Sequence, residues 1–408
     1  MEHKKHIVII SIWFYPLNRV AVNRINAFAK YLDKTKYTIS VLTLLQDESP
    51  ETEQVFGVNV YRERCNKIIR NRKQKVGDKK LVHSLKSVNN IAIGKLALGD
   101  FPGWKQKCLK QLERLHKKQS IDLLLSSFAP EDAHEIALAF KQKHSNVKWI
   151  ADMRDEMSLN PFYDGKRKRK LASLEQAITP HVDAISSVSL PILEGFKSLM
   201  NKNSSIDYLE VRNGFDHERR ERYNFNPVFT LLYAGTFYAE RKPNVFFSAL
   251  EKLKSQGDLP NDFKIQLLGT HLNFKIPNAL KDKVEILPSM SNEDCLSYMF
   301  KADCNLLLHP PMGVKGVFTG KLFEYLSTLK PVFGMVDMDD VAAELIDELN
   351  GGVCVDFYDE EAIMEAFLQL YTQWERKEKQ AYRVHLVDQL HRKVQTQVMG
   401  TEIEKLLS

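Results

Sequence analysis

The sequence predicts an α/β protein of two doubly wound domains, each a parallel β-sheet covered by helices on both faces. Short apolar runs alternate with amphipathic patterns along the whole chain, which is the order of elements in parallel sheets. The alternation restarts after a polar stretch at residues 212–227. The length of 408 residues also exceeds what one hydrophobic core usually organises.

The first half contains apolar runs that predict buried strands. These runs span residues 6–14, 37–44, 121–126, 147–151 and 183–189. Apolar residues at helical spacing predict amphipathic helices between the strands. They are Ile25, Phe28, Ala29 and Leu32 in one helix, and Trp104, Cys108, Leu112 and Leu115 in another.

The apolar run IVIISIWFY, which follows Lys4 and Lys5, also has features of a secretory signal. Pro16 and Arg19 end it without a clear small-residue cleavage site. Its β-branched residues suit a buried strand, so we favour a strand over a signal peptide.

The second half repeats the pattern of strands and helices. Strands are predicted at 229–234, 264–268, 284–287, 303–308, 331–336 and 352–355, with helices at 243–255, 292–300, 320–329, 340–349 and 359–374.

We therefore expect a first domain at 1–211, a linker at 212–227 and a second domain at 228–374. The polar tail, 375–408, should form helices that pack back on the body. Ligands of open parallel sheets bind beyond the carboxyl ends of the strands, so we expect the site in a central cleft that the two domains face.

The composition, 44% hydrophobic and 27% charged, is typical of a soluble globular protein. The five cysteines are widely spread and lack metal-ligand spacing, so we expect neither a disulfide framework nor a zinc site. No apolar run approaches the ~20 residues that span a bilayer. These features favour a reducing, cytoplasmic setting.

The net charge of +6 is concentrated in two basic segments, 62–80 and 166–170. Such segments can bind an anionic membrane surface or a phosphorylated acceptor, which would place the protein on the inner face of the cytoplasmic membrane. Solvated loops explain them equally well. Nucleic acid is disfavoured because no aromatic residues are interleaved with the charges.

The stretch FTGKLFEYLSTLKPVFG, residues 318–334, predicts a ligand-binding helix start. Thr319 is a candidate N-cap, and Gly320 lets an anion approach the backbone N–H groups at the positive end of the helix dipole. Lys321 adds a positive charge, and Glu324 can accept hydrogen bonds from the vicinal hydroxyls of a ribose. An ordinary i, i+3 surface pair of Lys321 and Glu324 is the alternative.

A second cationic helix start is predicted in LLYAGTFYAERKP, residues 231–243. A strand ends at Gly235, and Arg241 and Lys242 precede the next helix, where Pro243 suits the first helical position. Both basic loops would lie at the same edge of the sheet and could bracket one diphosphate. The P-loop pattern is not met, because it needs glycine at Lys315 and a hydroxyl residue at Leu322.

Other signals have ordinary explanations. The Asp-x-Asp of DMDD, residues 337–340, could hold a metal, but it precedes a helix, so capping by Asp339 or Asp340 is favoured. The role of His134 is open, and Asn213 followed by Gly214 suits a turn.

Six segments of the sequence resemble segments of retaining GT-B glycosyltransferases of the large GT4 type (glycosyltransferase group 1), especially bacterial cell-surface polysaccharide enzymes. The Lys-x-x-Glu-Tyr-Leu element followed by Lys-Pro-Val is the most specific match. The matching segments are FYPLNRVAVNRINAFAKYL near the start, SSFAPEDAHEIALAF at 126–140, IADMRDE at 150–156, VRNGFD at 211–216, YAGTFYAERKP at 233–243 and TGKLFEYLSTLKPVFG at 319–334.

The resemblance implies transfer of a sugar from a UDP- or GDP-linked donor to a glycan or lipid-linked acceptor hydroxyl, with retention of configuration and without a metal or other cofactor. It places Glu324 on the donor ribose and Lys242 on the diphosphate. It places Asp152 and Arg154 in a loop near the reacting sugar, although with Asp155 they could instead be a structural ion-pair cluster. The other substrate-binding candidates are Gly235, Thr236, Arg241, Thr319, Gly320 and Lys321.

The sequence departs from the family pattern at three places. Gly316 stands where the first glutamate of Glu-x7-Glu is expected, and Lys321 could replace its contact. Thr236 stands where an arginine is common, and Arg241 could substitute for it. Asn18 and Arg19 stand where a glycine pair is expected.

Two other functions agree with the same sequence. A nucleotide-sugar epimerase of this fold would use similar phosphate contacts but need no acceptor site. A catalytically silent nucleotide-binding scaffold would explain Gly316 and Thr236.

Overall fold

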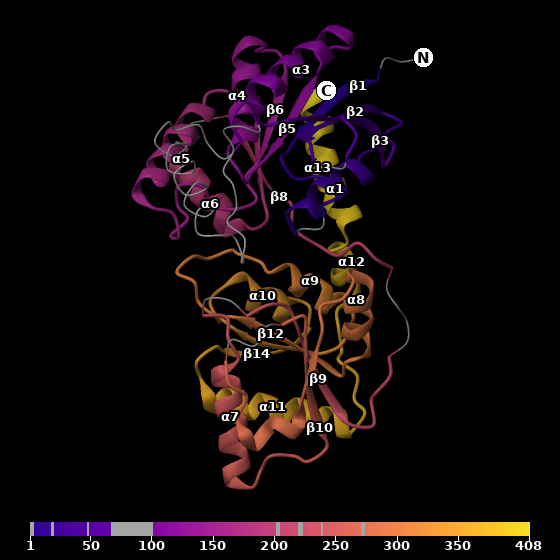
Figure 1. The fold of residues 1–408 in the computed structure, drawn as a ribbon, viewed down its shortest axis with the longest axis vertical. Helices are drawn as coiled ribbons and strands as arrows, with labels where there is room; N and C mark the ends of the chain where they lie inside the picture. The colour runs from indigo at the N-terminus through magenta and orange to yellow at the C-terminus, as the bar shows by residue number, and fades with distance from the viewer. Residues whose placement is uncertain are drawn as a thin grey trace, which may run out of the picture. The chain divides into compact units, whose positions relative to one another are not determined.

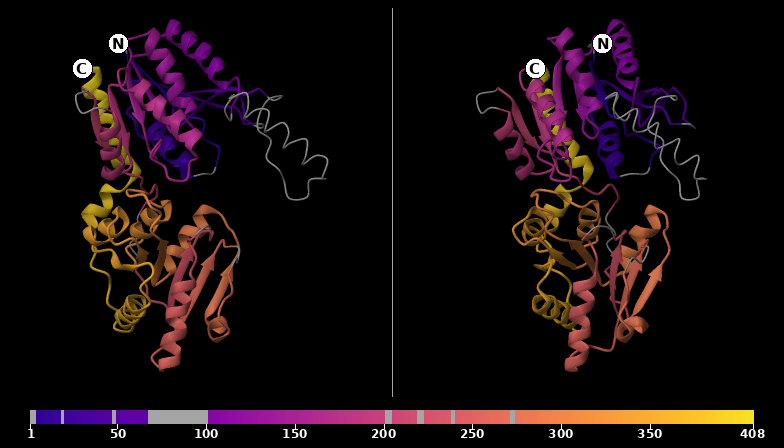
Figure 2. Two further views of the ribbon diagram at one scale, coloured as in Figure 1. Left: turned by 90° about the vertical axis from the view of Figure 1, so that its left-hand side faces the viewer. Right: turned by 60° about the vertical axis from the view of Figure 1, so that its left-hand side comes forward.

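The computed structural model describes residues 4–17, 20–46, 49–66, 101–200, 205–218, 223–237, 240–270 and 274–408. The chain forms two compact units (Figures 1 and 2). The first comprises Met1–Val211 with Thr396–Ser408, and the second comprises Arg212–Gln395. Among the described residues, no helix has both the length and the hydropathy to cross a bilayer.

The first unit contains a sheet in the order β3-β4-β2-β1-β5-β6-β7-β8. All neighbours are parallel except β3 and β4, which form an antiparallel hairpin. The strands are β1 (Lys5–Ile10), β2 (Tyr37–Leu44), β3 (Thr52–Val55), β4 (Val58–Glu63), β5 (Leu123–Ser127), β6 (Lys148–Asp152), β7 (Ala184–Ser187) and β8 (Asp207–Glu210).

Helices cover both faces of this sheet, because successive residues of its strands point to opposite faces. Val8 and Ile10 belong to the core under one set of helices, and Ile7 and Ile9 to the core under the other. The first set is α3 (Trp104–Lys118), α4 (Asp132–Lys143), α5 (Gly165–Ile178) and α6 (Leu190–Leu199); the second is α1 (Val20–Tyr31) and α13 (Arg392–Leu407).

The end of the chain is part of the first unit. Met399 and Ile403 of α13 are fully buried in the same core as Ile25 and Phe28 of α1. Figure 1 shows α13, in yellow, within the unit that contains the indigo N-terminal strands.

The second unit contains a fully parallel sheet in the order β11-β10-β9-β12-β13-β14. Helices α7 and α11 cover one face, and α8, α9, α10 and α12 cover the other. The strands are β9 (Phe229–Ala234), β10 (Phe263–Leu268), β11 (Val284–Leu287), β12 (Cys304–His309), β13 (Val332–Val336) and β14 (Gly352–Asp356). The helices are α7 (Asn244–Gln256), a 3-10 helix (Asn278–Lys283), α8 (Asn292–Lys301), α9 (Gly320–Ser327), α10 (Val341–Glu348), α11 (Glu360–Glu375) and α12 (Val384–Gln389).

The predicted fold class is confirmed, and the predicted strands recur with small shifts in their ends. The first strand stops at Ile10 instead of residue 14. The helix expected at 320–329 stops at Ser327, because Leu329 adopts a positive φ of 58°, a conformation that ends helices. The hairpin of β3 and β4 and the edge strand β8 are additional elements that the apolar pattern did not predict.

Candidate functional site

The candidate site lies at the carboxyl ends of the strands in the second unit's sheet. β9 and β12 are neighbours there, while β10 and β11 extend the sheet on one side and β13 and β14 on the other. The order of strands therefore reverses between β9 and β12, which is where open parallel sheets bind ligands. The two loops predicted to carry cations follow these two strands directly.

A hydrogen bond between side chains joins the two loops. Nη2 of Arg241, in the loop after β9, lies 2.9 Å from Nδ1 of His309, the last residue of β12. A guanidinium can only donate, so Nδ1 accepts. The other ring nitrogen, Nε2, lies 2.9 Å from the carbonyl oxygen of Val317 and donates to it.

A second hydrogen bond ties α9 to β9. The N–H of Ala234, the last residue of β9, donates to the hydroxyl oxygen of Tyr325 at 2.9 Å. Both residues are buried, and burial raises the pKa of the Tyr325 hydroxyl. The second turn of α9 is thus held beside the end of β9, and the two segments singled out in the sequence are brought together.

The first turn of α9 contains the predicted cap. Thr319 is the N-cap, as expected, and its Oγ1 accepts from the N–H of Leu322 at 3.3 Å. Gly320 is the first helical residue. Lys321 Nζ lies 2.8 Å from Glu324 Oε2, so the i, i+3 ion pair named as the alternative does form. Oε1 of Glu324 accepts no hydrogen bond from any residue in the described part of the chain.

The loop after β9 carries the other substrate-binding candidates. Gly235 has a φ of 151°, which only glycine adopts readily, and Thr236 is exposed. Lys242 is half-buried, and its Nζ makes no ion pair with a described residue. Pro243 is the N-cap of α7, which begins at Asn244, whereas the sequence placed Pro243 at the first helical position.

Two acidic side chains in the loop after β13 hold the loop after β12. Asp340 caps α10, as predicted, and also accepts from the N–H of Gly316 at 2.7 Å. Asp337 pairs with Lys315 at 2.8 Å, and the hydrogen bond from Lys315 lowers the pKa of Asp337. Gly316 has a φ of 92°, so the position of the absent family glutamate is one that disfavours any side chain. Within the described ranges, no three His, Cys, Asp or Glu residues are placed to hold a metal ion.

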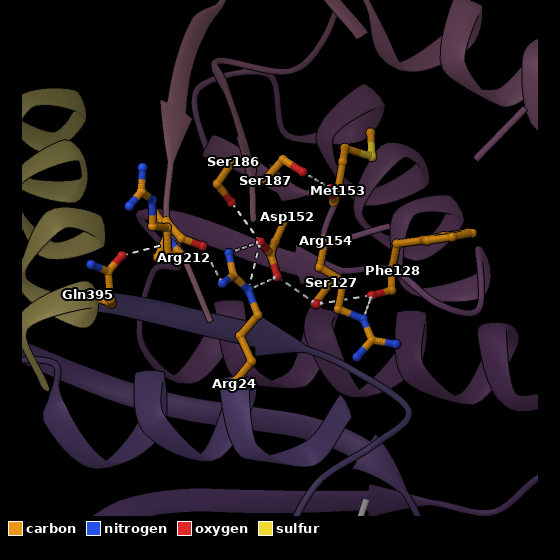
Figure 3. Close-up of polar contacts among 11 residues, drawn as sticks. Arg24, Ser127, Phe128, Asp152, Met153, Arg154, Ser186, Ser187, Arg212 and Gln395 are labelled. Carbon is orange, nitrogen blue, oxygen red and sulfur yellow. Dashed lines mark hydrogen bonds and ion pairs between the residues drawn. The ribbon is translucent and has the colours of Figure 1, made fainter. Parts of the chain in front are cut away.

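The first unit buries Asp152 in a polar cluster at the end of β6 (Figure 3). Its carboxylate accepts from Arg24 Nε at 3.0 Å and from Arg24 Nη2 at 2.7 Å. Ser127 and Ser186 donate to the two oxygens, each at 2.8 Å. Asp152 is 0% exposed and Arg24 is 5% exposed.

This cluster connects four elements of the first unit. Arg24 comes from α1, Ser127 from β5 and Ser186 from β7, and Nη1 of Arg24 also donates to the carbonyl of Val211 at 2.5 Å. Burial would raise the pKa of Asp152, but the charge of Arg24 and the hydrogen bonds lower it below its usual value. These contacts agree with the alternative given from the sequence, in which Asp152 has a structural role. The catalytic role of Asp152 stays a prediction.

Arg154 does not share this cluster. Its Nε donates to the carbonyl of Phe128, and its Nη2 lies 3.3 Å from Asp155. The ion-pair cluster proposed from the sequence therefore divides in two: Asp152 pairs with Arg24, and Arg154 with Asp155. His134, whose role was open, is fully buried with Nδ1 2.7 Å from Ser126 Oγ.

Three residues of these sites were not singled out in the sequence. Arg24 lies in an amphipathic helix, where a polar residue is normally exposed. His309 closes an apolar run, and Tyr325 follows Glu324 in a helix whose apolar face already explains an aromatic residue. The only available signal was position, because His309 directly follows the predicted strand 303–308.

No family model and no curated protein matches the chain. Sucrose-phosphate synthase from Thermosynechococcus elongatus matches with a TM-score of 0.63 at 12% identity, over 99% of both chains. A trehalose-6-phosphate protein from E. coli, bound with UDP-2-fluoro glucose, matches with a TM-score of 0.64 at 9% identity, also over 99% of both chains.

A third solved structure is the lipopolysaccharide outer core galactosyltransferase WaaB in its apo form. It matches with a TM-score of 0.59 at 10% identity, over 98% of this chain and 99% of the other. Two α/β units with parallel sheets that match these proteins almost end to end define the GT-B fold of glycosyltransferases.

Proposed function

We propose that the chain is a retaining glycosyltransferase of the GT4 type, which moves a hexosyl or related sugar from a nucleotide-sugar donor to an acceptor hydroxyl. The acceptor is a glycan or a lipid-linked acceptor of capsule, O-antigen or exopolysaccharide synthesis. In this proposal, residues 228–374 bind the donor and residues 1–211 bind the acceptor.

One observation carries the proposal: two cation-bearing loops follow neighbouring strands and are joined to each other. Arg241 and Lys242 precede α7, and Lys321 lies in the first turn of α9. The contacts Arg241–His309 and Ala234–Tyr325 hold these loops together. Cations and backbone N–H groups at helix starts suit a diphosphate.

The chemistry follows from where charge develops during transfer. The bond between the anomeric carbon and the diphosphate breaks, a bond to the acceptor oxygen forms, and the departing phosphate oxygen takes the acceptor's proton. The leaving diphosphate gains negative charge, which preorganised cations stabilise. Arg241 and Lys242 stabilise this charge, and Arg241 takes the place of the family arginine that is absent at Thr236. Glu324 binds the ribose through Oε1. No metal is required, so EDTA should leave the rate unchanged.

Donor turnover by the purified chain tests the proposal. A panel of UDP- and GDP-sugars is incubated with the chain, with and without candidate acceptors, and released nucleotide and sugar products are measured. Lys242→Ala and Glu324→Ala should each lower turnover at least tenfold, because each removes a charged contact to the donor. Matched controls are Lys301→Ala, at the end of α8, and Glu365→Ala, exposed on α11.

The outcomes separate the alternatives. Turnover of Lys242→Ala and Glu324→Ala equal to that of their controls would reject the assigned roles. Conversion of the donor to a different nucleotide sugar without an acceptor would show an epimerase. Binding of no nucleotide at all would favour a scaffold.

We further propose that α5 contacts an anionic membrane surface from the cytoplasmic side. Arg167 and Lys170 pair with Glu131 at 3.0 and 2.9 Å. The other three cations at the start of α5 are Lys166, Lys168 and Arg169, and they form no ion pair with a residue in the described ranges. Phe162, which precedes α5, is 71% exposed.

The other basic segment, 62–80, contributes fewer cations to this proposed contact within the described residues. Residues 67–80 of segment 62–80 lie outside them, while Arg62 pairs with Glu53 and Arg64 with Glu51. Sedimentation with anionic vesicles tests the contact. Binding should fall when Lys166, Lys168 and Arg169 are changed to glutamine, and equal binding to neutral vesicles would reject it.

A further inference from the structure

We infer that His309 is a positioning residue that orients the guanidinium of Arg241 toward the donor diphosphate. The inference rests on the proposed function and concerns a residue outside the predicted site. His309 is 2% exposed and ends β12, at the point where the order of strands reverses.

Both ring nitrogens of His309 are used, and each has one role. Nδ1 accepts from Arg241 Nη2 and Nε2–H donates to Val317, each at 2.9 Å. The second bond fixes the tautomer, so the lone pair of Nδ1 always faces the guanidinium. The ring cannot rotate without losing both bonds inside a buried site, which is costly.

The imidazole stays neutral under ordinary conditions. Burial, followed by the charge of Arg241, lowers the pKa of His309 to about 4. Among the other charged groups near the ring, Asp337 raises this pKa, and Asp337 itself pairs with Lys315. A neutral acceptor orients Arg241 without adding a negative charge where an anion is to bind. A carboxylate in its place would repel the diphosphate.

His309 also shapes the loop that leads to the second helix start. The carbonyl that accepts from Nε2–H belongs to Val317, two residues before the N-cap Thr319 of α9. One imidazole therefore holds a cation from the loop after β9 and the approach to α9. Its loss should affect recognition of the diphosphate more than recognition of the nucleoside.

The test compares His309→Leu, His309→Asn and Arg241→Met, alone and in the His309→Leu/Arg241→Met pair. Calorimetry measures binding of UDP and GDP against uridine and guanosine, and kinetics give the KM for the donor. His309→Leu should weaken diphosphate binding about tenfold and leave nucleoside binding unchanged. His309→Asn, which keeps an acceptor oxygen, should recover most of the loss.

The pair decides between positioning and general packing. His309→Leu should have no further effect on diphosphate binding once Arg241 is methionine. An additive loss, an equal loss for nucleosides, or no loss at all would overturn the inference while leaving the proposed function standing.

Arg241→Lys keeps the test decisive if His309→Leu fails to fold. This change retains the charge but loses the guanidinium fork. Diphosphate binding should again fall about tenfold, and binding equal to that of the parent would overturn the inference. If the parent binds no diphosphate, the proposed function itself fails.

Discussion

Asp152→Asn should destabilise the first unit by about 3–5 kcal/mol, because it leaves the guanidinium of Arg24 buried without its counter-charge. The side chains of the pair are 4% and 0% exposed, and two guanidinium nitrogens bind the carboxylate. Asparagine has nearly the same shape, so the loss arises from charge and hydrogen bonding. Ser127 and Ser186 also lose a charged acceptor.

Urea and thermal unfolding measure this loss separately in the two units. Trp104 and Trp149 are fully buried in the first unit, and Trp374 lies in the second. Fluorescence with single-tryptophan variants therefore follows each unit. For a domain of this size, 3 kcal/mol corresponds to a fall in Tm of about 6–12 °C. The unfolding of the second unit should not change.

Asp155→Asn is the matched control, because Asp155 is an aspartate just after β6 whose own side chain is 51% exposed. Exposed pairs contribute about 0–1 kcal/mol. Equal stability of Asp152→Asn, Asp155→Asn and the parent would refute the structural account of Asp152. Loss of turnover in Asp152→Asn with unchanged stability would instead support its catalytic assignment.

Three further results are expected. The folded state lowers the pKa of Asp152, so its contribution to stability is complete above the unfolded pKa near 3.9 and is lost as the pH falls through the folded pKa. The stability of the first unit should therefore fall less steeply with acid in Asp152→Asn than in the parent. Equal steepness in the two proteins would contradict this. Tyr325→Phe leaves the buried N–H of Ala234 without its acceptor and should cost the second unit about 1–3 kcal/mol in urea unfolding; an unchanged midpoint would reject the contact. Gly316→Ala should cost about 1–2 kcal/mol because of its positive φ, and a stabilised variant would contradict that conformation.

The alternation of apolar runs and helical patterns was sufficient to predict both sheets. Parallel strands buried on both faces leave a continuous apolar signal, as in β1, β9 and β12. The hairpin of β3 and β4 leaves a weaker one. Its turn uses Phe56 and Gly57 at φ 55° and 75°, and a phenylalanine at positive φ carries no turn signal in a sequence. β8 is a short edge strand of half-buried residues, so its pattern is equally weak.

The candidate site was predictable where local chemistry determines it and not where distant residues meet. Thr319 and Asp340 cap their helices because the cap bond is made within a few residues. The partners of Arg241 and Asp152 lie 68 and 128 residues away in the chain. Only the register of the sheets brings such residues together, so His309 and Arg24 could not be identified from spacing.

The central claim is that the loops after β9 and β12 bind one diphosphate. Calorimetric titration of the chain with UDP and GDP, at low and high salt, tests it most directly. We predict that at least one nucleoside diphosphate binds, that salt weakens the binding, and that Lys242→Ala weakens it at least tenfold while Lys301→Ala does not. Absence of binding by both nucleotides, or equal affinity in the two variants, would contradict the claim.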